Sequence, residues 1–174
     1  ATLMNGNVKN SDNRGTVEDD IVGKFEGAAA QNSYNSKRMG GLIGGEARKL
    51  SLHAQEKEGL CGDLLQKAVT YAMATLETNA SMGLIVASPT AGSAGIVPGL
   101  MLAMQEHYDF SDEEIIQVLF NASAIGYLAM RNATVAGAVG GCQAEVGVAS
   151  AMAASAAVEL MGGPPKECTF AAST

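Results

Sequence analysis

The chain has 174 residues, a length that fits one domain with a buried core and is short for two. Its 18 acidic residues against 11 basic ones give a formal net charge of -7, and no basic stripe runs along it, which argues against a nucleic-acid partner. Three widely spaced cysteines do not make a disulfide framework, and the sequence shows no secretion leader. We therefore expect a reducing, cytoplasmic location.

Residues 1–40 differ in composition from the rest of the chain. The segments MNGNVKNSDNRG and AAAQNSYNSKRMGG are polar, rich in Asn and Gly, and without apolar periodicity. They predict a polar N-terminal arm or long loops, with one short helix from Thr16, whose hydroxyl can cap it ahead of Glu18 and Asp19. Residues 41–174 then form the predicted helical domain.

From Leu42 onward the pattern becomes helical. Asp63 is the expected N-cap of a helix whose apolar residues recur on one stripe. The residues expected to face the core from this helix are Leu64, Leu65, Ala68, Val69, Ala72, Met73 and Leu76.

Two further helices have clear start or stop signals. Ser111 and Glu114 in SDEE form a capping box directly before an apolar run. Another helix is expected from about Gln143 to Leu160, ended by a glycine pair and then a proline pair. These signals favour helices throughout this part of the chain.

No segment alternates cleanly between polar and apolar residues. GLIVAS, residues 83–88, is the one credible strand, and it equally fits a buried helix end. Alanine is plentiful and aromatic residues make up only 5% of the chain, so its helices can approach closely. The predicted fold is all-α, a compact bundle of packed helices with Gly-rich loops.

No charged residue lies between Glu77 and Glu106, a stretch long enough in principle to cross a bilayer. Within it, however, ASPTAGSAG supplies hydroxyls, a proline and glycines, and the chain has no Trp for an interfacial belt. Buried core is therefore expected and membrane insertion is not. The less favoured alternative is a membrane transporter with a helix broken around Pro89 to Pro98.

The loop SPTAGSAGIVPG, residues 88–99, is the first candidate for chemistry. It combines glycines, the hydroxyls of Thr90 and Ser93, and an expected helix start near Ile96, which suits a carboxylate or phosphate. It lacks the patterns GxxxxGK[ST] and GxGxxG, so nucleotide binding is not expected. On residues alone, a tight turn between buried segments is the favoured explanation of this loop.

The histidines and cysteines supply the remaining candidates. His53 and His107 lie in polar or charged segments, so surface positions are expected and a zinc site has little support. Cys61 and Cys168 are expected to be small buried hydrophobes. Cys142 follows glycines and directly precedes an expected helix, a setting that favours the thiolate of a nucleophile or metal ligand. The residues leave Cys142 open between a buried thiol and a functional one.

Four segments, taken together and in this order, resemble the α chain or catalytic domain of the iron-sulfur-dependent L-serine dehydratases. They are GLIGGEARKL from Gly41, ETNASMG from Glu77, SPTAGSAGIVPG from Ser88 and GCQAEVGVASAMAASAAVELMGG from Gly141. The resemblance covers nearly everything after about residue 36. It implies a lyase of amino-acid catabolism and gluconeogenesis that converts L-serine to pyruvate and ammonia without pyridoxal phosphate.

The resemblance also implies a 4Fe-4S cluster held by three cysteines. The iron without a protein ligand would act as a Lewis acid on the serine hydroxyl while a base removes the Cα proton. Cys142 matches the family's cluster cysteine, whereas Cys61 and Cys168 match no ligand. Because the other ligands belong to a segment that follows in relatives, we expect the chain as given to be truncated before them, cluster-free and inactive.

The same resemblance makes the glycine loop a cradle for the carboxylate of L-serine. The residues implied there are Ser88, Thr90, Gly92, Ser93 and Gly95. Lys37, Arg38 and Glu46 are further candidates to face the pocket, and no base is assigned. The family implies a β chain or β domain and a homo- or hetero-oligomer. The alternative is a noncatalytic, cluster-free helical domain that serves subunit assembly or binds small carboxylates.

Overall fold

The computed structural model describes residues 44–57 and 59–174, and the helix expected from Thr16 lies outside them. Seven α-helices and one 3-10 turn form within these ranges, and no strand occurs there. The predicted all-α fold is confirmed. The elements are α3 (Glu46–Glu56), α4 (Gly62–Ala80), η2 (Ala91–Ser93), α5 (Ile96–Tyr108), α6 (Asp112–Asn132), α7 (Gly137–Gly140), α8 (Cys142–Leu160) and α9 (Pro165–Ser173).

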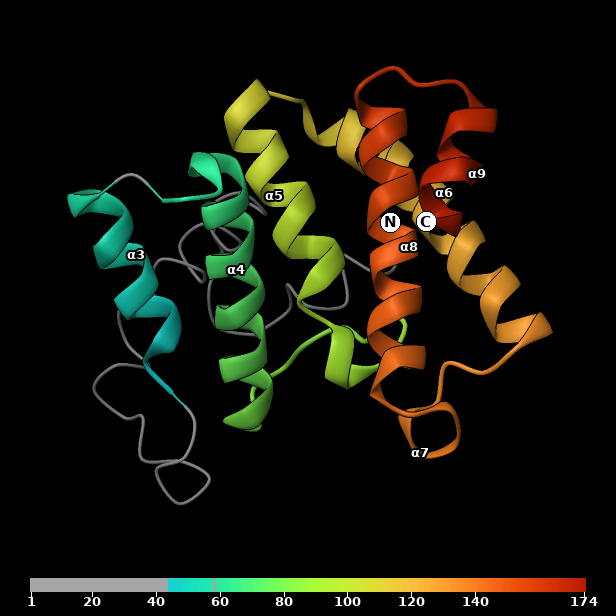
Figure 1. Ribbon diagram of the computed structural model, residues 1–174, viewed down its shortest axis with the longest axis horizontal. Coiled ribbons are helices and arrows are strands. Elements are labelled where there is room, and N and C mark those ends of the chain that lie inside the picture. Colours follow the sequence, from blue (N-terminus) through green and yellow to red (C-terminus); the bar gives the residue numbers. More distant parts are fainter. Residues whose placement is uncertain (1–43, 58) are drawn as a thin grey trace, which may run out of the picture.

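Helix α8 is the centre of the packing. It contacts α5, α6, α7 and α9, while α4 lies between α3 and α5 (Figure 1). The main core is built by the facing sides of α5, α6 and α8, with small alanines of α8 letting the helices approach closely. Its buried residues are Val97, Met101, Met104, Ile115, Val118, Leu119, Ala122, Met152, Ala153, Ala156 and Leu160.

The predicted capping box at the start of α6 is confirmed. The Ser111 hydroxyl accepts a 3.3 Å hydrogen bond from the N–H of Glu114, and the Glu114 carboxylate accepts a 2.8 Å bond from the N–H of Ser111. The two bonds satisfy N–H groups that have no partner within the helix. Helix α8 also ends where predicted, at Leu160, with Gly162 at φ 84 and Pro165 opening α9.

The start of α4 differs from the prediction. Its N-cap is Cys61 rather than Asp63, because Gly62 takes a φ of 77 and donates its N–H to the carbonyl of Gly59 at 3.1 Å. The chain thus turns into the helix two residues early. Asp63 falls in the first turn instead, where its charge favours the positive end of the helix dipole.

The predicted core stripe of α4 is only partly correct. Ala68 is buried, but Leu65, Val69 and Leu76 are 48%, 42% and 41% exposed. Because α4 lies between two helices, its buried surface includes polar positions such as Thr70, whose hydroxyl donates to a carbonyl one turn back. The helix periodicity was right, and the predicted face turns inward in part, since Leu64, Ala72 and Met73 are half-buried.

The segment GLIVAS forms neither a strand nor a helix end. Residues 83–88 are irregular, because α4 closes just before them with Gly83 donating its N–H to the carbonyl of Thr78 at 2.9 Å. Met82 has a φ of 62, which turns the chain out of the helix direction. The segment then runs back toward η2.

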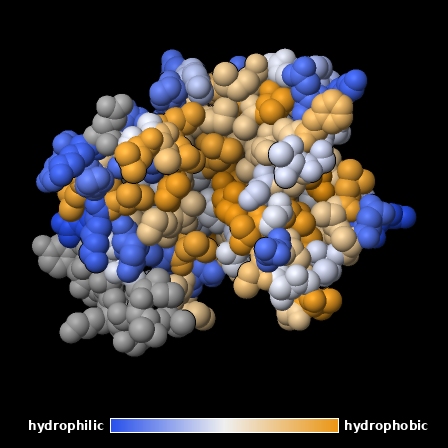
Figure 2. All heavy atoms as spheres, viewed as in Figure 1, coloured by the Kyte–Doolittle hydropathy of each residue, from blue (hydrophilic) through white to orange (hydrophobic). Residues whose placement is uncertain are grey.

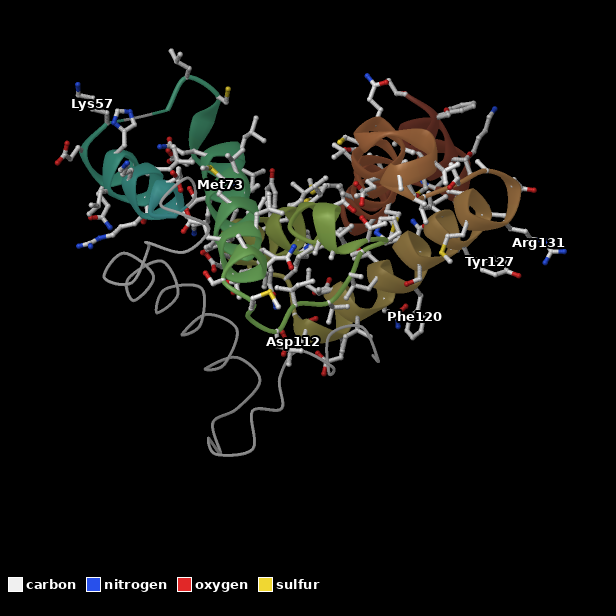
Figure 3. The ribbon with its side chains drawn as sticks, turned by 90° about the horizontal axis from the view of Figure 1, so that it is seen from below. Lys57, Met73, Asp112, Phe120, Tyr127 and Arg131 are labelled. Carbon is white, nitrogen blue, oxygen red and sulfur yellow. The ribbon has the colours of Figure 1, made fainter. Side chains whose placement is uncertain are left out.

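Several apolar side chains stay on the surface of the described residues. On the face shown in Figure 2, apolar residues gather over α4 and between α5 and α8. On α6, Phe120 and Tyr127 are exposed and point away from the other helices, as does Arg131, which donates to the Tyr127 hydroxyl at 3.3 Å (Figure 3).

Candidate functional site

The loop Ser88–Gly95 lies between α4 and α5. Its peptide bond before Pro89 is cis, and the N–H of Ser88 donates to the carbonyl of Thr90 at 3.2 Å. The Ser93 side chain is 1% exposed, and its hydroxyl donates to the carbonyl of Ser88 at 3.2 Å. Ser93 therefore holds the loop from inside, whereas Ser88 and Thr90 are half-buried.

The two candidate glycines of this loop have different surroundings. Gly95 is buried, and a side chain there would collide with the carbonyl oxygen of Ala72 in α4. Gly92 is exposed, and a Cβ there would lie 3.1 Å from Oε1 of Glu145. Gly95 thus lets the loop approach α4, and Gly92 leaves space for the carboxylate of Glu145.

The start of α8, where Cys142 lies, packs beside this loop. Gly141, at φ 78 and ψ 172, turns the chain so that Cys142 is the first helical residue, and its side chain is exposed. One helical turn later, Glu145 accepts a 2.5 Å hydrogen bond from the hydroxyl of Thr90.

Glu145 is the site residue that sequence reasoning missed. It belongs to the same GCQAE motif as Cys142, and its position one turn later on a helix was the available signal. What the sequence does not reveal is its partner, because Thr90 lies 55 positions earlier in the chain.

Three hydrogen bonds join the four motif segments at one end of the bundle. The N–H of Ala47 donates to Glu77 at 2.9 Å, Asn79 donates to the carbonyl of Ala91 at 3.1 Å, and Thr90 donates to Glu145. Figure 1 shows the start of α3, the end of α4, η2 and the start of α8 at this same end. We call it the motif end.

The three cysteines do not gather at the motif end. Cys61 caps the start of α4, at the opposite end of that helix, and is exposed rather than buried as expected. Cys168 is buried in α9, with its thiol 3.7 Å from the carbonyl of Gly163. Within residues 44–57 and 59–174, no group of three or more His, Cys, Asp or Glu side chains is arranged to hold a metal ion.

The other candidates have separate positions. The carboxylate of Glu46 accepts a 2.8 Å hydrogen bond from the N–H of Gly44, and backbone hydrogen bonds, first its own and then that of Gly44, lower its pKa. His53 and His107 each lie in the last turn of a helix. Lys37 and Arg38 lie outside the described residues.

In the described part of the chain, no helix combines the length and apolar character needed to cross a bilayer.

The family model described as "Serine dehydratase alpha chain" matches residues 7–174. The chain belongs to this family. The family predicted from the four motif segments is therefore confirmed. No solved structure matches the chain.

Individual members of the serine dehydratase alpha chain family agree with this assignment. The chain is 50% identical over 127 residues to the probable L-serine dehydratase, alpha chain, of Bacillus subtilis (strain 168), covering 73% of this chain and 42% of that protein. It is 46% identical over 132 residues to the L-serine dehydratase, alpha chain, of Peptoniphilus asaccharolyticus. This match covers 76% of this chain and 45% of that protein. The chain thus spans less than half the length of these curated relatives.

A longer relative also matches more than half of the chain. L-serine dehydratase 1 of Escherichia coli (strain K12) is 43% identical over 104 residues, which cover 59% of this chain and 23% of that protein. The family relation therefore extends to proteins of which this region is a minor part.

Proposed function

We propose that the protein is part of an L-serine dehydratase, which converts L-serine to pyruvate and ammonia. The observation that carries this proposal is the meeting of the four motif segments at the motif end, in a chain of the serine dehydratase alpha chain family. Segments separated in sequence are expected to converge in this way when they build one site.

In the proposed site, the loop Ser88–Gly95 binds the carboxylate of L-serine. We propose that Thr90 and Gly92 face the substrate, because they lie at the outer side of the loop beside α8. The Thr90 hydroxyl already donates to Glu145, so main-chain N–H groups of the loop would be the donors to the substrate. The buried Ser93 and Gly95 would shape the loop rather than touch L-serine.

The residues present do not by themselves fit the iron-sulfur cluster that the family implies. Cys142 supplies one exposed thiol at the motif end, and the described residues offer no set of three ligands. We propose that Cys142 is one ligand and that the others come from outside the described residues. A bound 4Fe-4S cluster would supply an iron able to act as a Lewis acid on the substrate hydroxyl.

The proposal extends to the partners of the chain. The names of the Bacillus subtilis and Peptoniphilus asaccharolyticus relatives specify an alpha chain. We infer that this chain likewise works with a β chain or β domain in an oligomer. A cytoplasmic location is part of the proposal, because the exposed thiols Cys61 and Cys142 need a reducing compartment to stay free.

The test is anaerobic reconstitution of the full-length natural enzyme with iron and sulfide, followed by assays of bound iron and of pyruvate released from L-serine. We expect activity in the wild type, loss of activity and of iron in Cys142→Ala, and retention of both in Cys61→Ala, the matched control. Full activity in Cys142→Ala would falsify the ligand role. A protein that binds L-serine but releases no pyruvate would support the noncatalytic carboxylate-binding alternative.

A further inference from the structure

Glu145 connects two elements that the proposed function requires to be aligned. It lies in the first turn of α8, one turn after Cys142, and its half-buried carboxylate accepts the hydrogen bond from Thr90. On one side of it is the proposed cluster ligand, and on the other the proposed substrate loop. The backbone of Glu145 belongs to α8, and the partner of its side chain, Thr90, belongs to the loop.

Glycines on two separate segments make room for this carboxylate. A Cβ added at Gly92 would lie 3.1 Å and 3.3 Å from the two carboxylate oxygens of Glu145. A Cβ added at Gly137, in α7, would collide with Oε2 of the same side chain. The carboxylate is therefore enclosed between two close backbone segments, and its position is set by shape as well as by its hydrogen bond.

The Thr90 hydroxyl, whose proton goes to Glu145, also lies beside a second hydroxyl of the loop. The Thr90 hydroxyl oxygen lies 3.1 Å from that of Ser93, and Ser93 in turn donates to the carbonyl of Ser88. A contact at Glu145 is thus connected to both ends of the turn that contains the cis peptide. Loss of the Glu145 carboxylate removes the anchor of this whole chain of contacts.

We propose that Glu145 is a positioning residue, which fixes the substrate loop against the start of α8 so that the loop and the Cys142 thiol face the same space. The proposal rests on the function proposed above, because it assumes that this loop binds L-serine. It does not make Glu145 a catalytic residue, since the carboxylate acts through Thr90. If Glu145 has this role, replacing it should change both the stability of the loop Ser88–Gly95 and the binding of L-serine.

The experiment compares the full-length natural enzyme with its Glu145→Ala, Glu145→Gln and Thr90→Val variants. Glu159→Gln, on the exposed side of the same helix, is the matched control. Hydrogen–deuterium exchange measures the protection of residues 88–95. We expect exchange at least about tenfold faster in Glu145→Ala, because a hydrogen bond to a charged group is lost. Glu145→Gln, which keeps an oxygen acceptor, should be intermediate, and Glu159→Gln should match the wild type.

Steady-state kinetics provide the second measurement. In Glu145→Ala, KM for L-serine should rise about tenfold or more, with a smaller change in kcat, and Glu145→Gln should recover part of the loss. In the double variant Glu145→Ala/Thr90→Val, KM should rise no further than in the more affected single variant, because both changes remove the same contact. If Glu145→Ala does not fold, the Glu145→Gln and Thr90→Val variants carry both measurements.

The outcomes separate this proposal from the proposed function. Unchanged exchange of residues 88–95 in Glu145→Ala overturns the positioning role, whatever the activity. Independent, additive effects of Glu145→Ala and Thr90→Val on KM overturn it as well. If the wild type releases no pyruvate from L-serine, the proposed function fails, and the exchange measurement alone decides whether Glu145 holds the loop.

Discussion

The N–H of Ala47 donates a 2.9 Å hydrogen bond to Oε1 of Glu77, which lies 30 positions later in the chain. Ala47 is near the start of α3, where N–H groups have no partner within the helix, and Glu77 is 6% exposed. A buried carboxylate of α4 therefore caps the neighbouring helix. This contact ties α3 to the motif end.

We expect Glu77→Ala to lower the free energy of unfolding by about 1–3 kcal/mol, because it leaves a buried N–H without its acceptor. Glu77→Gln keeps an oxygen that can accept this hydrogen bond, so its free energy of unfolding should fall by less. Urea denaturation followed by circular dichroism measures both changes. The control is Glu56→Ala at the exposed end of α3, expected within about 0.5 kcal/mol of the wild type. Equal losses in Glu77→Ala and Glu56→Ala would contradict the capping role.

The capping box of α6 predicts a pH dependence of stability. Hydrogen bonds from the N–H and then the hydroxyl of Ser111 hold the pKa of Glu114 below its ordinary value of 4.5. A carboxyl whose pKa is lower in the folded state stabilises the fold above its unfolded pKa, and this contribution is lost as the pH falls through the folded value. The stabilisation is thus complete at neutral pH and disappears in acid.

The melting temperature of wild type and Glu114→Gln should therefore differ most at neutral pH, with the wild type more stable, and converge below the ordinary carboxyl pKa. Thermal unfolding over a pH series measures this difference. Glu113→Gln, one residue earlier in the same turn, is the control for the general effect of charge near the helix start. A difference that stays constant with pH would count against the proposed cause.

Two glycines should respond to alanine with opposite signs. A Cβ at Gly99 in α5 would lie 2.9 Å from the carbonyl oxygen of Ala68 in α4, so Gly99→Ala should cost about 1–3 kcal/mol of stability. A Cβ at Gly147 in α8 would meet nothing within 4 Å, so Gly147→Ala should stabilise by about 0.5–1 kcal/mol through helix propensity. Denaturation midpoints report both, and a stabilising Gly99→Ala would refute the close approach of α4 and α5.

The three cysteines should differ in reactivity. Cys61 and Cys142 are exposed, whereas Cys168 is 5% exposed in α9. In cluster-free protein, a thiol reagent should label the two exposed residues well before Cys168, because access limits the reaction. Peptide mass spectrometry over time gives the labelling rate of each site, with urea-unfolded protein as the reference. Early labelling of Cys168 would show that the packing of α9 against α8 does not shield its thiol.

Local signals were enough to predict much of the fold. Ser111 and Glu114 lie within one turn, so the capping box is visible in the sequence alone, and the glycines and prolines after Leu160 mark the end of α8 in the same way. The exposure of Leu65 could not be predicted, because it depends on which neighbours pack against α4. Helix periodicity establishes that a face is apolar, but not which element covers it.

The candidate site was predictable in its parts and not in its assembly. Cys142 and Thr90 were singled out from their motifs, and their roles stay proposals. The partnership of Thr90 with Glu145 depends on the packing of α8 beside the loop, and no pattern within either motif encodes it. The burial of Ser93 likewise follows from how the loop folds over the end of α4.

The turn between α8 and α9 is a suitable attachment site for a label or a surface tether. It lies at the opposite end of the bundle from the joined motif segments (Figure 1), and Met161 within it is exposed. A fluorophore or surface tether attached at position 161 through a group other than a thiol would spare the exposed Cys61 and Cys142, and it would lie most of the length of α8 away from Glu145. Single-molecule and immobilised assays of the protein can be anchored at this turn with the proposed site left open to solvent.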